Sequence, residues 1–330
     1  MQSNGIVKYL IKDLSLQMLH PGIICLMGPN GSGKSTLLRN LSGLASPLQG
    51  ELLYDSCPLK DLSTSQKAKL ISIVLTEMPT ETELTVSALL ALGRYPYSSW
   101  LGILHLSDQR AIEKAIDITG IGHLLEMKLS QLSDGERQIC MIARALAQET
   151  PFIFLDEPTS FLDIPNKLKI MKLLKYLSAF EGKYIVLATH DLDLALDIAD
   201  KIWLLSLGGN FYTGIPEDLV LNGNFEKIFS SQDWSMDFNT GKMNLNIPEN
   251  TYQVYLNKNQ QEGAVWTEKA LKKAGFDAID FAERNANTSF PRIEILGPNA
   301  WKIYISDTFS DVNTLEQLIQ KLKEYYQGLK

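Results

Sequence analysis

A glycine-rich segment near the start of the chain constrains the fold more than any other feature. It reads Gly-Pro-Asn-Gly-Ser-Gly-Lys-Ser-Thr over positions 28–36 and matches the pattern G-x-x-x-x-G-K-[ST]. The apolar run 23–27 comes directly before it, and an apolar-periodic stretch, 37–41, comes directly after it. The segment therefore predicts a buried strand, a tight loop and a helix in succession.

Loops of this kind bind phosphate, because their backbone N–H groups converge on phosphate oxygens and the following helix adds the positive end of its dipole. Lys34 would reach the outer phosphates, and Ser35 would ligate Mg²⁺. The loop predicts a site for a nucleoside triphosphate, and the alternative is a glycine-rich turn that matches by chance. The residues expected to bind the nucleotide are Gly28, Pro29, Asn30, Gly31, Ser32, Gly33, Lys34, Ser35 and Thr36.

Three short apolar runs predict the fold class. They span 23–27, 152–155 and 184–188, and each is followed by a helical pattern. Runs of this composition are typical of buried parallel strands, so we expect an α/β, doubly wound sheet. Between about 77 and 148 the apolar period becomes helical, which predicts a helical subdomain.

The second half of the chain predicts a change of domain. Residues 222–250 mix Asn, Gly, Ser and Asp with few apolar runs, so we expect a domain boundary or a loop-rich connection there. Beyond it, 252–256, 293–296 and 301–305 have the patterns of strands, and 266–274 and 312–326 have those of helices. We therefore expect a first domain over 1–245 and a small accessory α+β domain over 246–330.

Two carboxylates follow the strand predicted at 152–155. Asp156 and Glu157 would lie beside the glycine-rich loop, because the carboxyl ends of neighbouring parallel strands meet at one edge of a sheet. Asp156 would hold Mg²⁺ through water, and Glu157 would act as the general base for the attacking water. The alternative is that both acids only cap the following turn.

Composition excludes some classes of protein. The formal net charge of -7 and a pI near 5.3 argue against a dedicated nucleic-acid binder, so we expect no nucleic-acid partner. Three scattered cysteines favour a reducing compartment. Lys8, Lys12, Asp13 and His20 interrupt the apolar residues at the start, which lacks the pattern of a signal peptide. No run approaches the roughly 18 apolar residues of a membrane-spanning helix, so any membrane connection would come through a partner.

Three further segments carry a family resemblance. Residues 132–138, Leu-Ser-Asp-Gly-Glu-Arg-Gln, resemble the LSGGQ signature of ATP-binding cassette (ABC) ATPases, Ser160-Phe-Leu-Asp163 is similar to their D-loop, and His190 follows a strand where they have a switch histidine. The resemblance implies a P-loop NTPase fold of the ABC type that uses ATP and Mg²⁺. It implies a homodimer in which Ser133 and Gly135 face the ATP of the second copy, Asp163 contributes from the D-loop, and Lys34, Glu157 and His190 are catalytic.

The resemblance covers about residues 6–245 and is closer to one branch of the family. Residues 92–96, 162–164 and 190–195 look like importers of iron chelates (siderophores), haem and cobalamin. This implies an ATPase that lies peripherally on the cytoplasmic face of the inner membrane. There it would power two transmembrane permease subunits fed by an external substrate-binding protein. The alternatives are cassette ATPases of DNA repair, which carry long coiled-coil or zinc insertions, and translation-associated cassettes, which carry two cassettes and a basic linker.

The sequence departs from the family pattern in three places. Thr76, followed by Glu77, stands where the family has a Mg²⁺-contacting Gln, which puts a metal contact at Thr76 in doubt. Asp134 replaces the first Gly of the signature and is either a charge facing the partner's γ-phosphate or a helix cap. The adenine-stacking aromatic has no equivalent near positions 4–5. Tyr9 is the nearest candidate and is as well explained as a core residue.

The C-terminal domain lies outside the resemblance and has two interpretations. It is a passive, stabilising extension, or it is an active module that serves as a dimer contact or a regulator.

Overall fold

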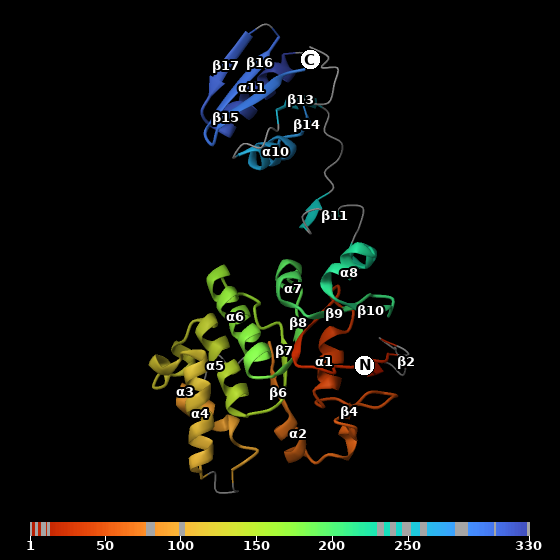
Figure 1. Cartoon of the computed structure of the whole chain (residues 1–330), viewed down its shortest axis with the longest axis vertical. Helices are drawn as coiled ribbons and strands as arrows, with labels where there is room; N and C mark the ends of the chain where they lie inside the picture. The colour runs from red at the N-terminus through yellow and green to blue at the C-terminus, as the bar shows by residue number, and fades with distance from the viewer. Residues whose placement is uncertain are drawn as a thin grey trace. The chain divides into compact units, whose positions relative to one another are not determined.

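The computed structural model describes residues 2–3, 6–7, 11, 14–76, 83–98, 103–229, 234–237, 242–245, 252–257, 263–280, 290–306 and 308–328. The chain folds as two compact units, Met1–Asn244 and Leu245–Lys330. Each unit is built around a sheet of its own, and Figure 1 labels the elements of both. No helix in the described ranges is both long enough and apolar enough to cross a membrane.

A six-stranded sheet organises the first unit, in the order β10-β9-β3-β8-β7-β6. Its strands are β3 (Gly22–Met27), β6 (Ile71–Val74), β7 (Phe152–Asp156), β8 (Tyr184–Ala188), β9 (Lys201–Leu205) and β10 (Phe211–Gly214). All neighbours pair in parallel except the β9–β10 hairpin. The α/β fold class is confirmed, and the three predicted strands are β3, β7 and β8 at the centre of the sheet.

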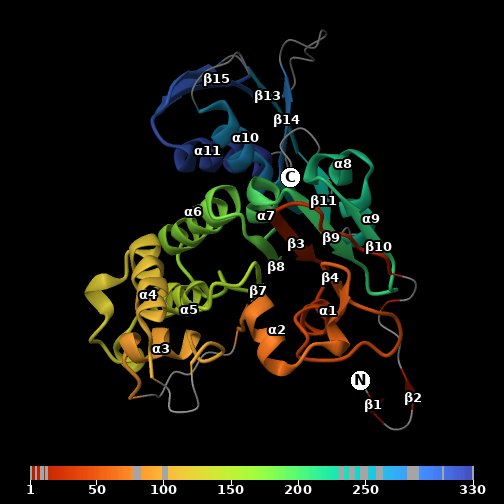
Figure 2. The same cartoon turned by 60° about the horizontal axis from the view of Figure 1, so that its bottom comes forward.

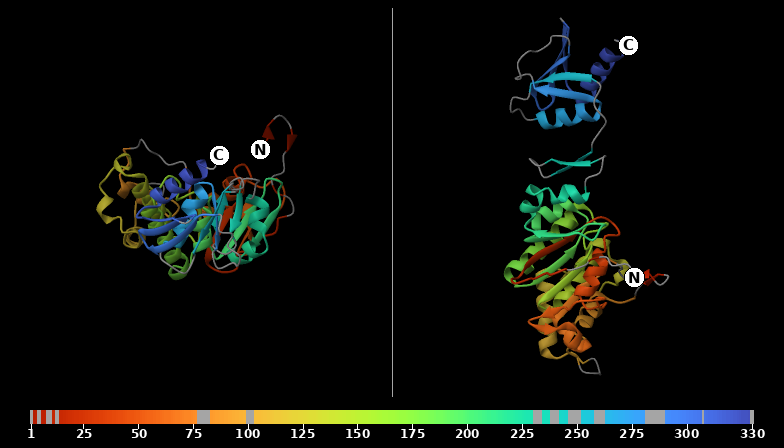
Figure 3. Two further views of the ribbon diagram at one scale, coloured as in Figure 1. Left: turned by 90° about the horizontal axis from the view of Figure 1, so that it is seen from above. Right: turned by 90° about the vertical axis from the view of Figure 1, so that its right-hand side faces the viewer.

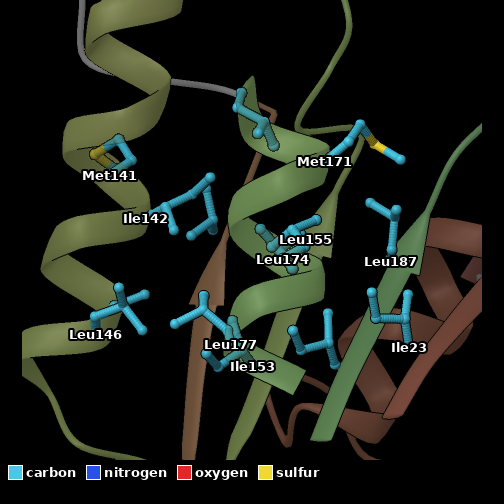
Figure 4. Close-up of a cluster of buried hydrophobic side chains, with 14 of the residues drawn as sticks. Ile23, Met141, Ile142, Leu146, Ile153, Leu155, Met171, Leu174, Leu177 and Leu187 are labelled. Atoms are coloured by element: carbon cyan, nitrogen blue, oxygen red, sulfur yellow. The ribbon is translucent and has the colours of Figure 1, made fainter. Parts of the chain in front are cut away.

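The two faces of this sheet bury separate cores, because successive side chains of a strand point to opposite faces. Along β3, Ile23 and Cys25 belong to one cluster and Ile24 and Leu26 to the other. Figure 4 shows the first face, where side chains of α5 (Asp134–Ala147) and α6 (Ile164–Phe180) pack over β7, β8 and β3. Helix α1 (Lys34–Leu41) packs on the second face.

A group of helices extends from the first unit where a helical subdomain is predicted. It contains α3 (Val86–Gly93), α4 (Leu106–Thr119) and the start of α5, drawn in orange to yellow-green at the left of Figure 2 and of the left-hand view in Figure 3. Arg94 ties the group together: its guanidinium lies 2.9 Å from Asp108 and 2.7 Å from Glu149, and it also bonds the carbonyl of Ala147. Residues 77–82 and 99–102 of the predicted range lie outside the described residues.

The predicted loop-rich connection is only partly correct. Residues 222–250 contain α9 (Asn224–Phe229), β11 (Trp234–Asp237) and β12 (Lys242–Leu245). Helix α9 escapes detection because it is short and is anchored by one side chain, Phe225, which is fully buried in the first core. The remaining elements of the first unit are β1 (Gln2–Ser3), β2 (Ile6–Val7), β4 (Leu53–Tyr54), β5 (Cys57–Pro58), α2 (Thr64–Leu70), α7 (Leu192–Ile198), α8 (Pro216–Leu221) and three 3₁₀ turns (Leu59–Asp61, Gly122–Leu124, Leu129–Gln131).

The second unit has a five-stranded sheet in the order β14-β13-β15-β16-β17, and α10 and α11 pack on one face of it (Figure 2). The predicted strands are observed, but β14 and β17 were not expected, and the last helix begins at Leu315 rather than near 312. Thr314 caps that helix by accepting a hydrogen bond from Gln317 N, so Val312 is left to the sheet. The elements are β13 (Tyr252–Leu256), α10 (Ala264–Lys273), β14 (Phe276–Asp280), β15 (Arg292–Gly297), β16 (Ala300–Ile305), β17 (Thr308–Val312) and α11 (Leu315–Gln327).

Candidate functional site

The glycine-rich loop joins β3 to α1, as the sequence predicts, and its glycines adopt conformations that other residues avoid. Gly28 has φ +151°, and a Cβ there would lie 2.3 Å from the carbonyl oxygen of Leu205, so no side chain fits. Gly33 has φ +102° and precedes α1 without any side-chain cap. The first N–H groups of α1 are therefore left available for an anion.

Ser32 and Lys34 line this loop with buried polar groups that suit phosphate. The Ser32 hydroxyl is buried and finds no hydrogen-bond partner in the described part of the chain. The Lys34 ammonium donates to the carbonyls of Gly28 at 2.8 Å and Pro29 at 3.2 Å. Burial lowers the pKa of Lys34, while Glu157 and Asp156 oppose that shift. Such an ammonium gains from a phosphate anion that replaces the carbonyls.

Asp156 ends β7 beside the loop and carries the oxygens that a hard cation needs. Its Oδ1 accepts a hydrogen bond from Ser35 Oγ at 3.3 Å, and burial raises the pKa of its carboxyl above the ordinary value. Thr76 donates its hydroxyl to the backbone carbonyl of Asp156 at 2.8 Å. Ser35 and Asp156 fit a Mg²⁺ site because two oxygen donors from different elements meet there. Thr76 acts on the backbone of Asp156 instead, and Glu77 lies outside the described residues.

Glu157 and His190 meet at the ends of the neighbouring strands β7 and β8. The Glu157 N–H donates to the Ala188 carbonyl at 2.9 Å, which continues the strand pairing past the end of β7. The Glu157 Oε2 lies 2.9 Å from His190 Nδ1 and accepts a hydrogen bond from Ser160 Oγ at 2.6 Å. Glu157 itself has φ +50°, a left-handed conformation that non-glycine residues rarely adopt. Strained residues of this kind cluster at functional sites.

The signature residues form the N-terminus of α5. Ser133 is the N-cap and exchanges hydrogen bonds with Glu136: Glu136 Oε2 accepts from Ser133 N at 2.9 Å and from Ser133 Oγ at 2.7 Å. Asp134 forms an ion pair with Arg137 at 2.8 Å, so it is both a first-turn acid and a partner of that guanidinium. In the described ranges, no hydrogen bond or ion pair joins Ser133 or Asp134 to the glycine-rich loop.

Gly135 connects the signature to the D-loop through α6. A Cβ at Gly135 would lie 2.6 Å from the side-chain nitrogen of Asn166, so glycine lets the two helix starts approach without a shift of the Asn166 side chain. Asp163 caps α6 by accepting a hydrogen bond from Asn166 N at 3.1 Å. The segment between Glu157 and Asp163 joins the end of β7 to the start of α6, and Asn166 of α6 lies against Gly135 at the start of α5.

The structure brings together most of the predicted site residues and adds two. Lys34, Ser35, Asp156, Glu157 and His190 gather at the carboxyl edge of β3, β7 and β8 through the contacts given above, whereas Ser133 and Gly135 belong to the start of α5. Sequence reasoning did not identify the Ser160 hydroxyl or Asn166 as neighbours of site residues. The D-loop motif contains Ser160 but gives no signal of its bond to Glu157. Asn4, Gly5 and Tyr9 lie outside the described residues.

Comparison with known proteins identifies the family. The ABC transporter family matches residues 11–160. The petrobactin import ATP-binding protein FpuC of Bacillus anthracis is 33% identical over 222 residues, which cover 67% of this chain and 82% of that protein. The chain belongs to the ABC transporter family. The ferric enterobactin transport ATP-binding protein FepC of Escherichia coli K12 is 34% identical over 226 residues, which cover 68% of this chain and 83% of FepC.

Further matches assign chemistry to the ABC cassette and a family to the second unit. The dimeric ATP-binding cassette MJ0796, solved in a post-hydrolysis state with ADP and Pi, aligns with a TM-score of 0.56 and 29% identity over 66% of this chain and 94% of that one. The chain is therefore an ATP-binding protein and an ATPase. The iron ABC transporter C-terminal domain matches residues 253–323. A cobalamin import ATP-binding protein of Halobacterium salinarum is 30% identical over 68% of this chain and 56% of that protein.

Proposed function

We propose that this ABC ATPase energises an importer of iron chelates such as siderophores. The observation that carries the proposal is the pairing of two matches on one chain. The cassette resembles ATPases named for petrobactin and ferric enterobactin, and the second unit matches a C-terminal domain described for iron ABC transporters. Haem is a second cargo of this branch, and cobalamin is a third, which the Halobacterium relative supports.

The residues at the sheet edge divide the work of ATP hydrolysis among them. Residues 28–36 would cradle the phosphates, and Lys34 would neutralise charge that develops on them. Glu157 would take a proton from the attacking water, with His190 and Ser160 holding its carboxylate. Ser35 and Asp156 would hold Mg²⁺, which supplies positive charge to the phosphates when bound.

Two copies of the chain would form the working unit. ABC cassettes dimerise, as in the MJ0796 structures, and we propose that Ser133 and Gly135 of one copy complete the ATP site of the other, with Asp163 nearby. The dimer would sit peripherally on the cytoplasmic face of the inner membrane, beneath two permease subunits fed by an external substrate-binding protein. No described segment between the ATP loop and the signature resembles the coiled coil of DNA-repair cassettes, since its longest helix, α4, has 14 residues.

Substitution of Glu157 tests the catalytic assignment. Glu157→Gln keeps the size and the hydrogen bonds of the side chain but cannot take the proton of water, so we expect ATP binding within about twofold of wild type and hydrolysis reduced about a hundredfold or more. The variant should also accumulate an ATP-bound dimer in size-exclusion chromatography. Glu217→Gln, an exposed acid at the start of α8, is the matched control. Hydrolysis near the wild-type rate in Glu157→Gln would remove Glu157 from the role of base.

Uptake measurements test the cargo. Cells that lack this chain should lose uptake of ⁵⁵Fe supplied as a siderophore complex and keep uptake of ⁵⁷Co-cobalamin. Tagged Glu157→Gln protein should co-purify from membranes with a permease. Loss of cobalamin uptake with normal iron uptake would show that the cargo is cobalamin and not an iron chelate. The assignment of the chain as an ATPase would be unaffected.

A further inference from the structure

A cavity in the second unit has no role in the ATPase cycle described above. It has a volume of about 570 Å³ and lies where α10 begins, where β15 turns into β16 and where β17 leads into α11. Four strands, β13, β14, β15 and β17, run in the direction of this edge. Ligands often bind at the carboxyl ends of strands in open α/β sheets. The residues that line it are Gly263, Trp266, Pro298, Asn299, Trp301, Asn313, Thr314 and Leu315.

One wall of the cavity is fixed by a chain of hydrogen bonds. Trp301 is buried, and its indole N–H donates to Thr267 Oγ1 at 2.9 Å. The Thr267 hydroxyl in turn donates to the Gly263 carbonyl at 2.9 Å. Each of these three polar groups has a hydrogen-bond partner, so this wall of the cavity is formed before any ligand binds. A preformed wall lowers the ordering cost of binding.

Another lining residue, Trp266, presents its indole to solvent. Trp266 in the first turn of α10 is 67% exposed although tryptophan is a large apolar side chain. The Lys269 ammonium lies 4.9 Å from the centre of its ring and covers part of one face. Trp266 lines the cavity, and aromatic rings stack favourably on indole.

The polar groups of the cavity suit an anion. In the described part of the chain, no lining residue carries a charge, and the side-chain donors there include the amides of Asn299 and Asn313, the Thr314 hydroxyl and the Trp266 indole N–H. Helix α10 begins at Gly263 with φ +104°, without a side-chain cap and without an acid in its first turn. Its first N–H groups therefore add positive potential at the cavity. Glu316 in the first turn of α11 lies outside the lining.

We propose that this cavity binds a planar aromatic carboxylate. The aromatic ring stacks on Trp266, and the carboxylate accepts hydrogen bonds from the asparagine amides and the start of α10. The volume lies within the range of small-molecule sites and admits a ligand of two fused rings. Every residue proposed to bind ATP belongs to the first unit, whereas all residues that line this cavity belong to the second.

Titration of the full-length chain with 2-naphthoate tests the proposal. Isothermal calorimetry and saturation-transfer NMR should detect binding of 2-naphthoate, while 2-naphthamide, which lacks the charge, and cyclohexanecarboxylate, which lacks the flat ring, should each bind at least about tenfold more weakly. Trp266→Ala should weaken 2-naphthoate binding by at least about tenfold, and Trp266→Phe should recover most of that loss.

The matched control is Phe309→Ala, because Phe309 is another exposed aromatic of the same unit, 63% exposed, outside the cavity. Far-ultraviolet circular dichroism and ATP affinity verify that each variant is folded. The proposal is overturned if 2-naphthoate fails to bind at millimolar concentration, if Trp266→Ala and Phe309→Ala bind equally well, or if the neutral amide binds as tightly as the carboxylate.

Discussion

Helices α1 and α5 begin in opposite ways, although both starts belong to the proposed ATP machinery. Helix α1 starts at Gly33 with φ +102°, without a side-chain cap and without an acid in its first turn. Helix α5 starts at Ser133 within a complete capping box and has Asp134 and Glu136 in its first turn. The first start leaves its N–H groups open, whereas the second already holds a carboxylate of its own chain.

The difference indicates what each helix start requires before it meets phosphate. At the start of α1, no side-chain cap has to be displaced before a phosphate binds, and Lys34 lies in the first turn of the helix. At α5, both donors of Ser133 are used by Glu136, so a phosphate oxygen from a second copy would have to displace that carboxylate. Arg137 offsets the other first-turn acid through its ion pair with Asp134. We therefore expect substitutions at α1 to act on ATP binding and those at α5 to act on the step after binding.

Lys34→Ala should have the largest effect. Removal of the ammonium leaves the phosphates without their charged partner, so we expect the affinity for ATP to fall by about a hundredfold or more. The measurement is equilibrium binding of a fluorescent ATP analogue to the purified chain. Lys60→Ala, an exposed lysine paired with Glu51, is the control. Unchanged affinity in Lys34→Ala would place the phosphates elsewhere.

Ser133→Ala should separate binding from turnover. Each chain keeps its own ATP loop, so we expect ATP affinity within about twofold of wild type, and steady-state hydrolysis should fall about tenfold because the partner's phosphate loses a hydrogen bond. A mixture of Ser133→Ala and Lys34→Ala chains should recover activity, since a mixed dimer contains one site with both residues intact. Absence of recovery, with mixed dimers shown by mass spectrometry, would contradict a shared site.

Glu136→Gln sharpens the comparison at α5. The neutral amide holds the Ser133 donors less strongly, so we expect ATP-dependent dimerisation to tighten about threefold.

The same substitution should change how stability depends on pH. The hydrogen bond from the Ser133 hydroxyl is the larger cause that lowers the pKa of Glu136, and the hydrogen bond from the Ser133 backbone N–H is the next. The ionised carboxylate therefore stabilises the folded state at pH values above the ordinary pKa of Glu. The small loss of thermal stability in Glu136→Gln should therefore be present at pH 7 and vanish as the pH falls through the lowered value. Thermal melts over a series of pH values from 7 downward measure the effect on stability, and sedimentation of the variant in the Glu157→Gln background with ATP measures dimerisation.

Asp156→Asn should give the smallest effect, and one of opposite sign. Burial raises the pKa of Asp156, so the ionised carboxyl destabilises the folded chain when the pH is above that raised value. Without nucleotide or Mg²⁺, we expect the variant to melt about 1–2 °C higher than wild type at pH 7, which corresponds to about 0.5 kcal/mol. The gain should disappear below the ordinary pKa of 3.8. A lower melting temperature at pH 7 would show that the hydrogen bond from Ser35 outweighs the burial of charge.

Local patterns predicted much of the first unit and less of the second. The strands β3, β7 and β8 are visible in the sequence because buried parallel strands are continuous apolar runs. The strands β14 and β17 are not, since β14 ends in Asp280 and β17 contains Ser310 and Asp311, so neither forms an apolar run. Their identity as strands depends on pairing with β13 and β16.

The sequence by itself determined the glycine-rich loop and the order of the motifs, because each motif is a short run whose backbone and side chains act locally. Only the tertiary structure decided which side chains meet. Thr76 donates to Asp156 across 80 positions of sequence, and Gly135 lies against Asn166, although no local pattern couples these pairs. Ser160 reaches Glu157 only because the turn after β7 folds back on itself. Such contacts arise when parallel strands and helix starts converge at one edge, and that convergence is a property of the packed sheet.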